Sequence, residues 1–180
     1  MEPIETISHK NHTISIFYDD CSESPREWDN LCEFHCCHRR YSLGDDGFNY
    51  STGSDCITAA KEAEKQGDIV LPLYLYDHSG ITISLTPFSC PWDSGQVGFV
   101  IVRRNKMLKE FGGKRFTQSL KKRAYDIAEG EVHTYDQFLR GEIYGYRIDE
   151  DGDSCWGFYG QEECIAEAKN IIDAMEQVSV

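Results

Sequence analysis

The spacing of apolar and polar positions changes repeatedly along the chain, so both strands and helices are expected. Residues 13–18 are rich in β-branched and aromatic side chains and begin with alternation, which predicts a strand. Two apolar runs joined by residues 77–80 predict a β-hairpin, and two more on either side of residues 149–153 predict a second. The expected strands are residues 13–18, 69–76, 81–86, 96–102, 143–148 and 154–159.

Capping residues and apolar positions at helical spacing predict the helices. Ser24 can cap free amides, Pro25 suits a first helical turn and Glu27 completes a capping box. Gly67 is expected to stop a later helix that begins at Ser54 or Asp55. The expected helices are residues 24–38, 54–66, 103–111, 117–128 and 134–141, and a last one with Ile165, Ala168, Ile172 and Met175 on one stripe.

The order of these elements predicts the fold class. Strands come as hairpins rather than as regular strand–helix–strand units, which favours an α+β fold with an antiparallel sheet built from hairpins and flanking helices. The sequence shows no repeat, linker or low-complexity segment. We therefore expect residues 1–180 to form a single domain.

Composition narrows the class of protein. The 180 residues carry a formal net charge of −13, and their 40% hydrophobic and 12% aromatic content is typical of a folded protein rather than a disordered acidic tail. No window approaches the apolar length of a transmembrane helix, and the polar first 13 residues lack a signal-peptide core. We expect a cytoplasmic protein without membrane contact, and the charge disfavours direct binding to duplex DNA.

Charge is segregated along the chain. Residues 103–123 hold nine basic residues and one acidic residue, a net charge of +8, whereas residues 124–180 have a net charge of −11. Two interpretations are open. Folding could return the basic segment to acidic neighbours in the same molecule or in the second subunit of a homodimer, or the protein could present two binding surfaces of opposite sign.

The densest group of metal-type ligands lies in residues 32–38. If this segment is helical, Cys32, His35 and Cys36 share one face and could hold zinc with a fourth ligand from elsewhere. The alternative is that the cysteines are small buried side chains with polar neighbours. The spacing is not that of a standard zinc motif, and no C-x-x-C pair occurs, so we expect free thiols and no metal or other cofactor.

The catalytic motifs of common enzyme classes are missing from the sequence. There is no G-x-S-x-G, P-loop or dinucleotide fingerprint. Cys90 could present a reactive thiol with His78 or His133 as base, but the spacing does not bring them together. The residue pattern therefore favours a non-enzymatic protein.

Aromatic side chains gather around both expected hairpins, and about half of those on alternating strands should face the core. The remainder would form an exposed surface suited to protein recognition, unless a helix covers them. Around the first hairpin lie Tyr74, Tyr76, Phe88 and Trp92, and around the second lie Tyr144, Tyr146, Trp156, Phe158 and Tyr159.

Four stretches carry a resemblance to a known family: residues 24–31 (SPREWDNL), 71–80 (LPLYLYDHSG), 87–99 (PFSCPWDSGQVGF) and 153–160 (DSCWGFYG). They resemble a family of small acidic proteins encoded by bacteriophages and mobile elements of Gram-positive bacteria. The resemblance covers most of residues 24–160. Small acidic proteins of mobile elements often block host defence, so it implies an inhibitor in the host cytoplasm, such as an anti-CRISPR protein that binds a nuclease effector and its guide RNA.

This hypothesis assigns roles to two groups of charged residues. Carboxylates placed like phosphates can occupy a basic groove, and lysines can contact RNA or a second subunit. The acidic candidates are Asp149, Glu150, Asp151 and Asp153, and the basic candidates are Lys106, Lys109, Lys121 and Lys122. The competing hypotheses are a zinc-binding nucleic-acid-processing or regulatory protein and a phage structural accessory protein.

Overall fold

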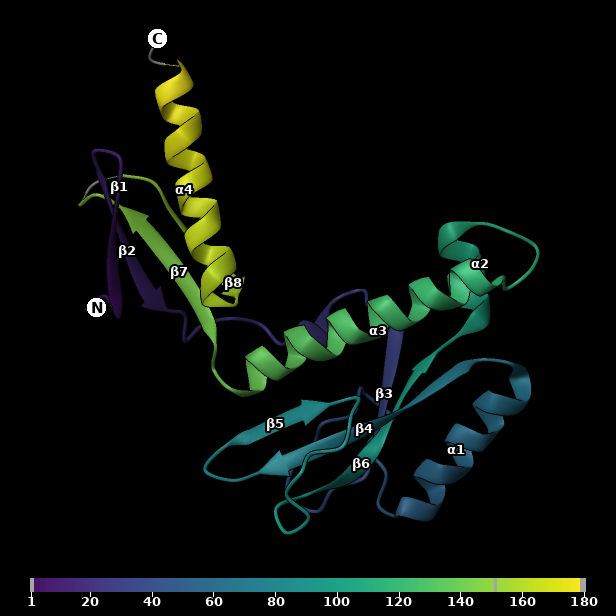
Figure 1. The fold of residues 1–180 in the computed structure, drawn as a ribbon. Helices are drawn as coiled ribbons and strands as arrows, with labels where there is room; N and C mark the ends of the chain where they lie inside the picture. Colours follow the sequence, from purple (N-terminus) through teal and green to yellow (C-terminus); the bar gives the residue numbers. More distant parts are fainter. Residues whose placement is uncertain (1, 151, 179–180) are drawn as a thin grey trace. The chain divides into compact units, whose positions relative to one another are not determined.

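The computed structural model describes residues 2–150 and 152–178 and has the expected α+β architecture. In this part of the chain two four-stranded sheets, each fully antiparallel, accompany four α-helices (Figure 1). The fold divides into two compact units: a first unit of residues 1–24 and 137–180, and a second unit of residues 25–136. That both form one folding domain remains a prediction.

The first unit is a sheet with one helix packed on its face. Its strands β1 (Glu5–His9), β2 (His12–Tyr18), β7 (Ile143–Ile148) and β8 (Ser154–Tyr159) lie in that order, and α4 (Gln161–Val178) follows. Alternate positions of β2 and β7 point toward α4 because successive side chains of a strand face opposite sides. The core consists of Ile14, Ile16, Tyr144, Tyr146, Ile148, Cys164, Ala168 and Ile172.

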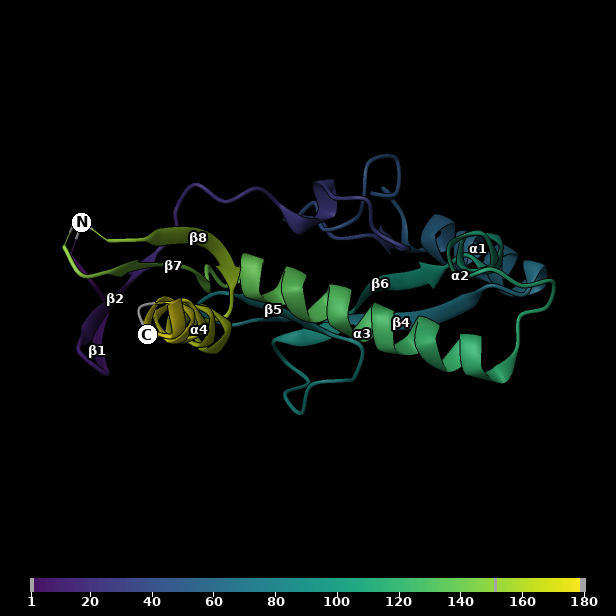
Figure 2. The ribbon, with the colours of Figure 1, turned by 90° about the horizontal axis from the view of Figure 1, so that it is seen from above.

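The second unit is a sheet between two helices. Its strands, in spatial order, are β3 (Cys32–Cys36), β6 (Ser94–Val102), β4 (Ile69–Asp77) and β5 (Ile81–Ser84). Its helical segments are the 3-10 turn η1 (Pro25–Glu27), α1 (Gly53–Gln66), α2 (Arg104–Phe111) and α3 (Gln118–Leu139), whose last residues from Gln137 on belong to the first unit. Figures 1 and 2 show α1 and α3 on opposite sides of the sheet.

Contacts from β3 distinguish the two faces. Phe34 meets the ring of Tyr135 on α3, with ring centroids 5.7 Å apart. On the α1 side, the thiol of Cys56 donates to the carbonyl of His35 at 3.3 Å. Because Cys32, Phe34 and Cys36 alternate with His35, these three residues face α3 and His35 faces the other way.

Both expected hairpins form. Strands β7 and β8 have the expected bounds, and β4 and β5 pair from Tyr74↔Ser84 to Asp77↔Ile81. Helix α1 is capped by Thr52, whose hydroxyl accepts from the Asp55 amide at 3.2 Å, and it ends at Gly67 in a left-handed conformation with φ 78°. Capping and turn signals therefore located these elements closely.

The expected helix over residues 24–38 is wrong. Only η1 forms, and the chain then enters β3. The side-chain amide of Asn30 donates to the carbonyls of Pro25 at 2.7 Å and Trp28 at 3.0 Å, so these acceptors are taken by a turn rather than by a continuing helix. The segment then becomes a buried strand because both of its faces are covered.

The separate helix expected over residues 134–141 is also wrong, because α3 runs without a break to Leu139. Thr134 does not cap a new helix. Its hydroxyl donates to the carbonyl of Gly130, four residues earlier, at 3.0 Å. This bond is the usual one for a threonine in a helix interior, and Gly130 is tolerated there at a modest cost. Strand β1 was not predicted, because it is a polar, exposed edge strand.

A buried arginine joins η1 to the rest of the second unit. The side chain of Arg26 is 8% exposed and forms ion pairs with Asp45 at 2.8 Å and with Glu131 of α3 at 2.9 Å. Its guanidinium also donates to the carbonyl of Cys32 at 2.9 Å and lies 3.9 Å from the ring centroid of Phe34. One side chain thus connects a loop, a strand and a helix.

Candidate nucleic-acid interface

The junction between β6 and α2 is positioned by Asp68, in the connection before β4. One carboxylate oxygen of Asp68 accepts from the backbone amide of Arg104 at 2.9 Å, and the other accepts from the guanidinium of Arg103 at 3.0 Å. Buried Met107 anchors α2 in the core. The first turn of α2 is therefore fixed, and its polar residues project outward.

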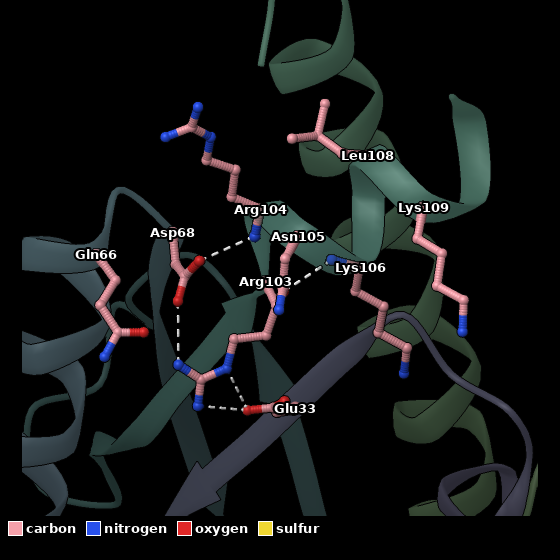
Figure 3. Close-up of a pocket in the computed structure, with 9 residues that line it drawn as sticks. All are labelled: Glu33, Gln66, Asp68, Arg103, Arg104, Asn105, Lys106, Leu108 and Lys109. Carbon is pink, nitrogen blue, oxygen red and sulfur yellow. Dashed lines mark hydrogen bonds and ion pairs between the residues drawn. The ribbon is translucent and has the colours of Figure 1, made fainter. Parts of the chain in front are cut away.

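This junction forms one side of a hollow with a volume of about 730 Å³ (Figure 3). In Figure 3 the side chains of Lys106 and Lys109 extend in the same direction, and that of Arg104 extends away from them. The spacing of Lys106 and Lys109 places them on one face of α2. The lining residues are Glu33, Gln66, Asp68, Arg103, Arg104, Asn105, Lys106, Leu108 and Lys109.

The charged side chains at the floor of the hollow form ion pairs with one another. Arg103 pairs with Glu33 at 2.7 Å and with Asp68 at 3.0 Å, and these hydrogen bonds, led by that with Glu33, raise the pKa of its guanidinium. Burial would raise the pKa of Glu33, but hydrogen bonds from His35 and Arg103 outweigh it and lower that pKa to about 2. Arg103 and Glu33 therefore remain a charged pair at neutral pH.

Basic residues line the rim of the hollow, and more of them lie in the loop after α2 and at the start of α3. Lys106 donates to the carbonyl of Asn30. Among residues 104–121, all of which the structure describes, five exposed cations have no carboxylate within 4.0 Å of their side-chain nitrogens, and we call these five the basic surface. They are Arg104, Lys109, Lys114, Arg115 and Lys121.

Contacts between α2 and α3 hold this surface together. The guanidinium of Arg123, on α3, lies 3.8 Å from the ring centroid of Phe111, the last residue of α2. Lys122 pairs with Asp126 one turn along α3 at 2.8 Å, so part of its charge is neutralised. The loop carrying Lys114 and Arg115 therefore connects two helices that touch each other.

The basic candidates from the sequence all lie in the second unit. Lys106 and Lys109 line the hollow, and Lys121 and Lys122 lie at the start of α3. Lys122 is partly neutralised, as the intramolecular interpretation of the basic segment expects. Sequence reasoning missed Arg104, although the charge count of residues 103–123 contained the signal.

The acidic candidates lie in the first unit, except that Asp151 is outside the described residues. Asp149 does not project freely. It has a positive φ of 53°, and its carboxylate accepts from the Thr13 amide at 2.9 Å and pairs with His12 at 2.7 Å. These hydrogen bonds, that of Thr13 first, lower the pKa of Asp149. The hydrogen bonds of Asp149 thus stabilise the turn, whereas its neighbours Glu150 and Asp153 are exposed to solvent.

The cysteine–histidine group is not the ligand face that a helix would have made. In β3, Cys32 and Cys36 face α3 and His35 faces the opposite side, where its ring stacks on Phe48 with centroids 4.0 Å apart. Burial is the main cause that raises the pKa of both thiols. Among the residues described, no group of three or more metal-ligating side chains comes together.

Cys90 and His78 both contact one carboxylate, that of Asp93, rather than each other. Asp93 lies between them, 3.7 Å from the Cys90 sulfur and 3.3 Å from Nδ1 of His78. A thiol nucleophile needs a base within direct reach, and here its neighbour is the carboxylate. His133 lies on α3 and faces solvent.

Comparison with known proteins leaves the function to be argued from these residues. No family model matches the chain, and neither the curated proteins nor the solved structures contain a match. None of the helices, within the residues described, is long and apolar enough to cross a bilayer.

Proposed function

We propose that this protein is a non-enzymatic binding protein whose basic surface contacts the RNA of a nucleoprotein partner. The observation that carries the proposal is the set of five exposed cations on α2, α3 and their connecting loop, which lack carboxylate partners in the described part of the chain. Such cations gain free energy by displacing counterions from a phosphate backbone. Acidic residues elsewhere repel nucleic acid in general, so contact is restricted to this surface.

The class of partner follows from the resemblance and from the two signs of charge. A nuclease effector loaded with guide RNA offers phosphates and basic protein surface at once. The protein then acts as an inhibitor of host nuclease defence in the host cytoplasm, as an anti-CRISPR protein does, by occupying the effector–guide complex and blocking DNA binding or cleavage. The contact is electrostatic, so it is expected to weaken as salt rises.

The test is a cleavage assay with purified RNA-guided nuclease effectors and increasing amounts of the protein. We expect inhibition that is complete near one protein per effector, and binding that is weaker to the effector without guide RNA. The variant Arg104→Ala/Lys109→Ala should inhibit less than the wild type. The matched control is Arg39→Ala/Lys61→Ala, which removes two exposed cations outside the hollow. If no effector is inhibited, or if both variants inhibit equally well, the proposal is wrong.

A further inference from the structure

The second unit has another polar hollow at the opposite end of β6 from α2. Its volume is about 320 Å³, and it lies where β4 ends at Asp77 and β6 begins at Ser94. The nine residues of β6, at about 3.3 Å each, place its two ends roughly 26 Å apart. Figure 1 shows β6 running from the loop after β5 up to α2. The two hollows therefore belong to opposite ends of one sheet.

Trp92 lines this hollow and is 91% exposed. An indole is one of the largest apolar surfaces a residue can offer, and exposed tryptophans are typical centres of protein–protein contacts. The loop that carries Trp92 is held in place: Asp77 donates its amide to the Asp93 carbonyl at 2.8 Å, and the Ser94 hydroxyl donates to the Cys90 carbonyl. Trp92 is thus presented on a fixed loop.

The side chains around Trp92 are suited to binding a cation. Asp93 follows it directly, and the Asp93 side chain is 41% exposed even though it pairs with His78. The same hollow already holds one guanidinium in this way: Arg40 pairs with Asp77 and lies 5.3 Å from the ring centroid of Tyr41. An aromatic face with a neighbouring carboxylate is the combination that binds arginine and lysine side chains.

We propose that Trp92 and Asp93 form a docking site for a cationic segment of a partner protein, with an arginine or lysine side chain on the indole. Charge complementarity selects this occupant over RNA, because Asp77 is already neutralised by Arg40 whereas the carboxylate of Asp93 is exposed and would repel phosphates. The site uses residues separate from the basic surface. It gives the second unit a protein-binding end and an RNA-binding end.

The test measures binding of a fluorescently labelled hexa-arginine peptide by anisotropy at low salt. The variants Trp92→Ala and Asp93→Asn should each weaken binding about five- to tenfold, and Trp92→Phe should recover part of the loss because it restores an aromatic face. Trp92→Ala leaves the net charge unchanged, so its effect separates the indole from general attraction to an acidic protein. Circular dichroism should show that each variant is folded, as expected for an exposed side chain.

Two further measurements complete the test. Trp28→Ala removes another exposed indole and should leave peptide binding unchanged. Oligouridylate binding should be unchanged in Trp92→Ala, and peptide binding should not weaken in Arg104→Ala/Lys109→Ala, which makes the protein more acidic. Wild-type peptide affinity in Trp92→Ala would overturn the docking site, and so would equal losses in Trp28→Ala. Loss of oligouridylate binding instead of peptide binding in Trp92→Ala would also overturn it and identify a nucleobase platform.

Discussion

Glu33 and Asp68 neutralise Arg103, the first cation of the basic segment, within the second unit. Glu33 accepts hydrogen bonds from both His35 and Arg103, and Arg103 also reaches Asp68. The side chain of Arg104, the next residue, is exposed and has no carboxylate within 4.0 Å among the described residues. Adjacent residues of the same charge thus have different roles, which sequence alone does not reveal.

The lowered pKa of Glu33 predicts a specific acid dependence of stability. Its pKa is about 2 in the folded protein against 4.5 for the unperturbed group, so between these values the unfolded state binds more protons. The stability that Glu33 contributes is therefore fully present above about pH 4.5 and is lost as the pH falls toward 2. At neutral pH, Glu33→Gln should lower the free energy of unfolding by about 1–2 kcal/mol.

Urea unfolding at pH 7, 4.5 and 3 checks this prediction. The difference in free energy of unfolding between wild type and Glu33→Gln should shrink as the pH falls below 4.5. A difference that stays constant over this range would show that Glu33 is not held ionised by its partners.

At the scale of elements, Arg26 should dominate the stability of the second unit. Its removal leaves Asp45 and Glu131, both less than one-fifth exposed, without their common cation. Breaking such a buried pair typically costs about 3–5 kcal/mol, so Arg26→Ala should unfold at much lower denaturant concentration. Arg26→Lys keeps the charge but loses the planar fork, and an intermediate loss is expected. A loss below about 1 kcal/mol in both variants would contradict this role.

Strand β3 also predicts the outcome of metal analysis. Its alternation separates Cys32 and Cys36 from His35, and standard zinc sites bring their ligands to one point. Purified protein should contain less than about 0.2 zinc per chain by elemental analysis. A value near one, lost in Cys32→Ala, would revive the zinc-binding hypothesis.

Local signals located most elements, and tertiary contacts decided the exceptions. Residues 143–159 and the α1 segment follow alternation, capping and turn chemistry closely. Residues 24–38 begin with the capping residues of a helix, but the side chain of Asn30 donates to the carbonyls of Pro25 and Trp28 and forms a turn instead. The strand β3 that follows is covered by α3 on one face and by α1 on the other. The site was partly predictable for the same reason. The charge count indicated a basic surface, but only folding shows that Arg103 is neutralised and that Trp92 is presented to solvent.

For the whole molecule, a net charge of −13 coexists with a basic surface at one end of a sheet. If the protein binds RNA as proposed, its acidic residues repel RNA from the other faces, and the five cations should account for most of the phosphate contact. At the opposite end of β6, in the same unit, the exposed carboxylate of Asp93 lies beside Trp92. This separation of charge predicts which side chains would set the salt dependence of the proposed RNA binding.

The most direct test is the affinity for a labelled single-stranded oligouridylate, measured over a series of salt concentrations. For single strands, the logarithm of affinity against the logarithm of salt has a slope of about −0.7 for each phosphate neutralised. Arg104→Ala/Lys109→Ala should weaken binding and make the slope shallower by about 1.4, whereas the charge-matched Arg39→Ala/Lys61→Ala should keep the wild-type slope. No measurable RNA binding by the wild type, or the same change of slope in both variants, would contradict the account.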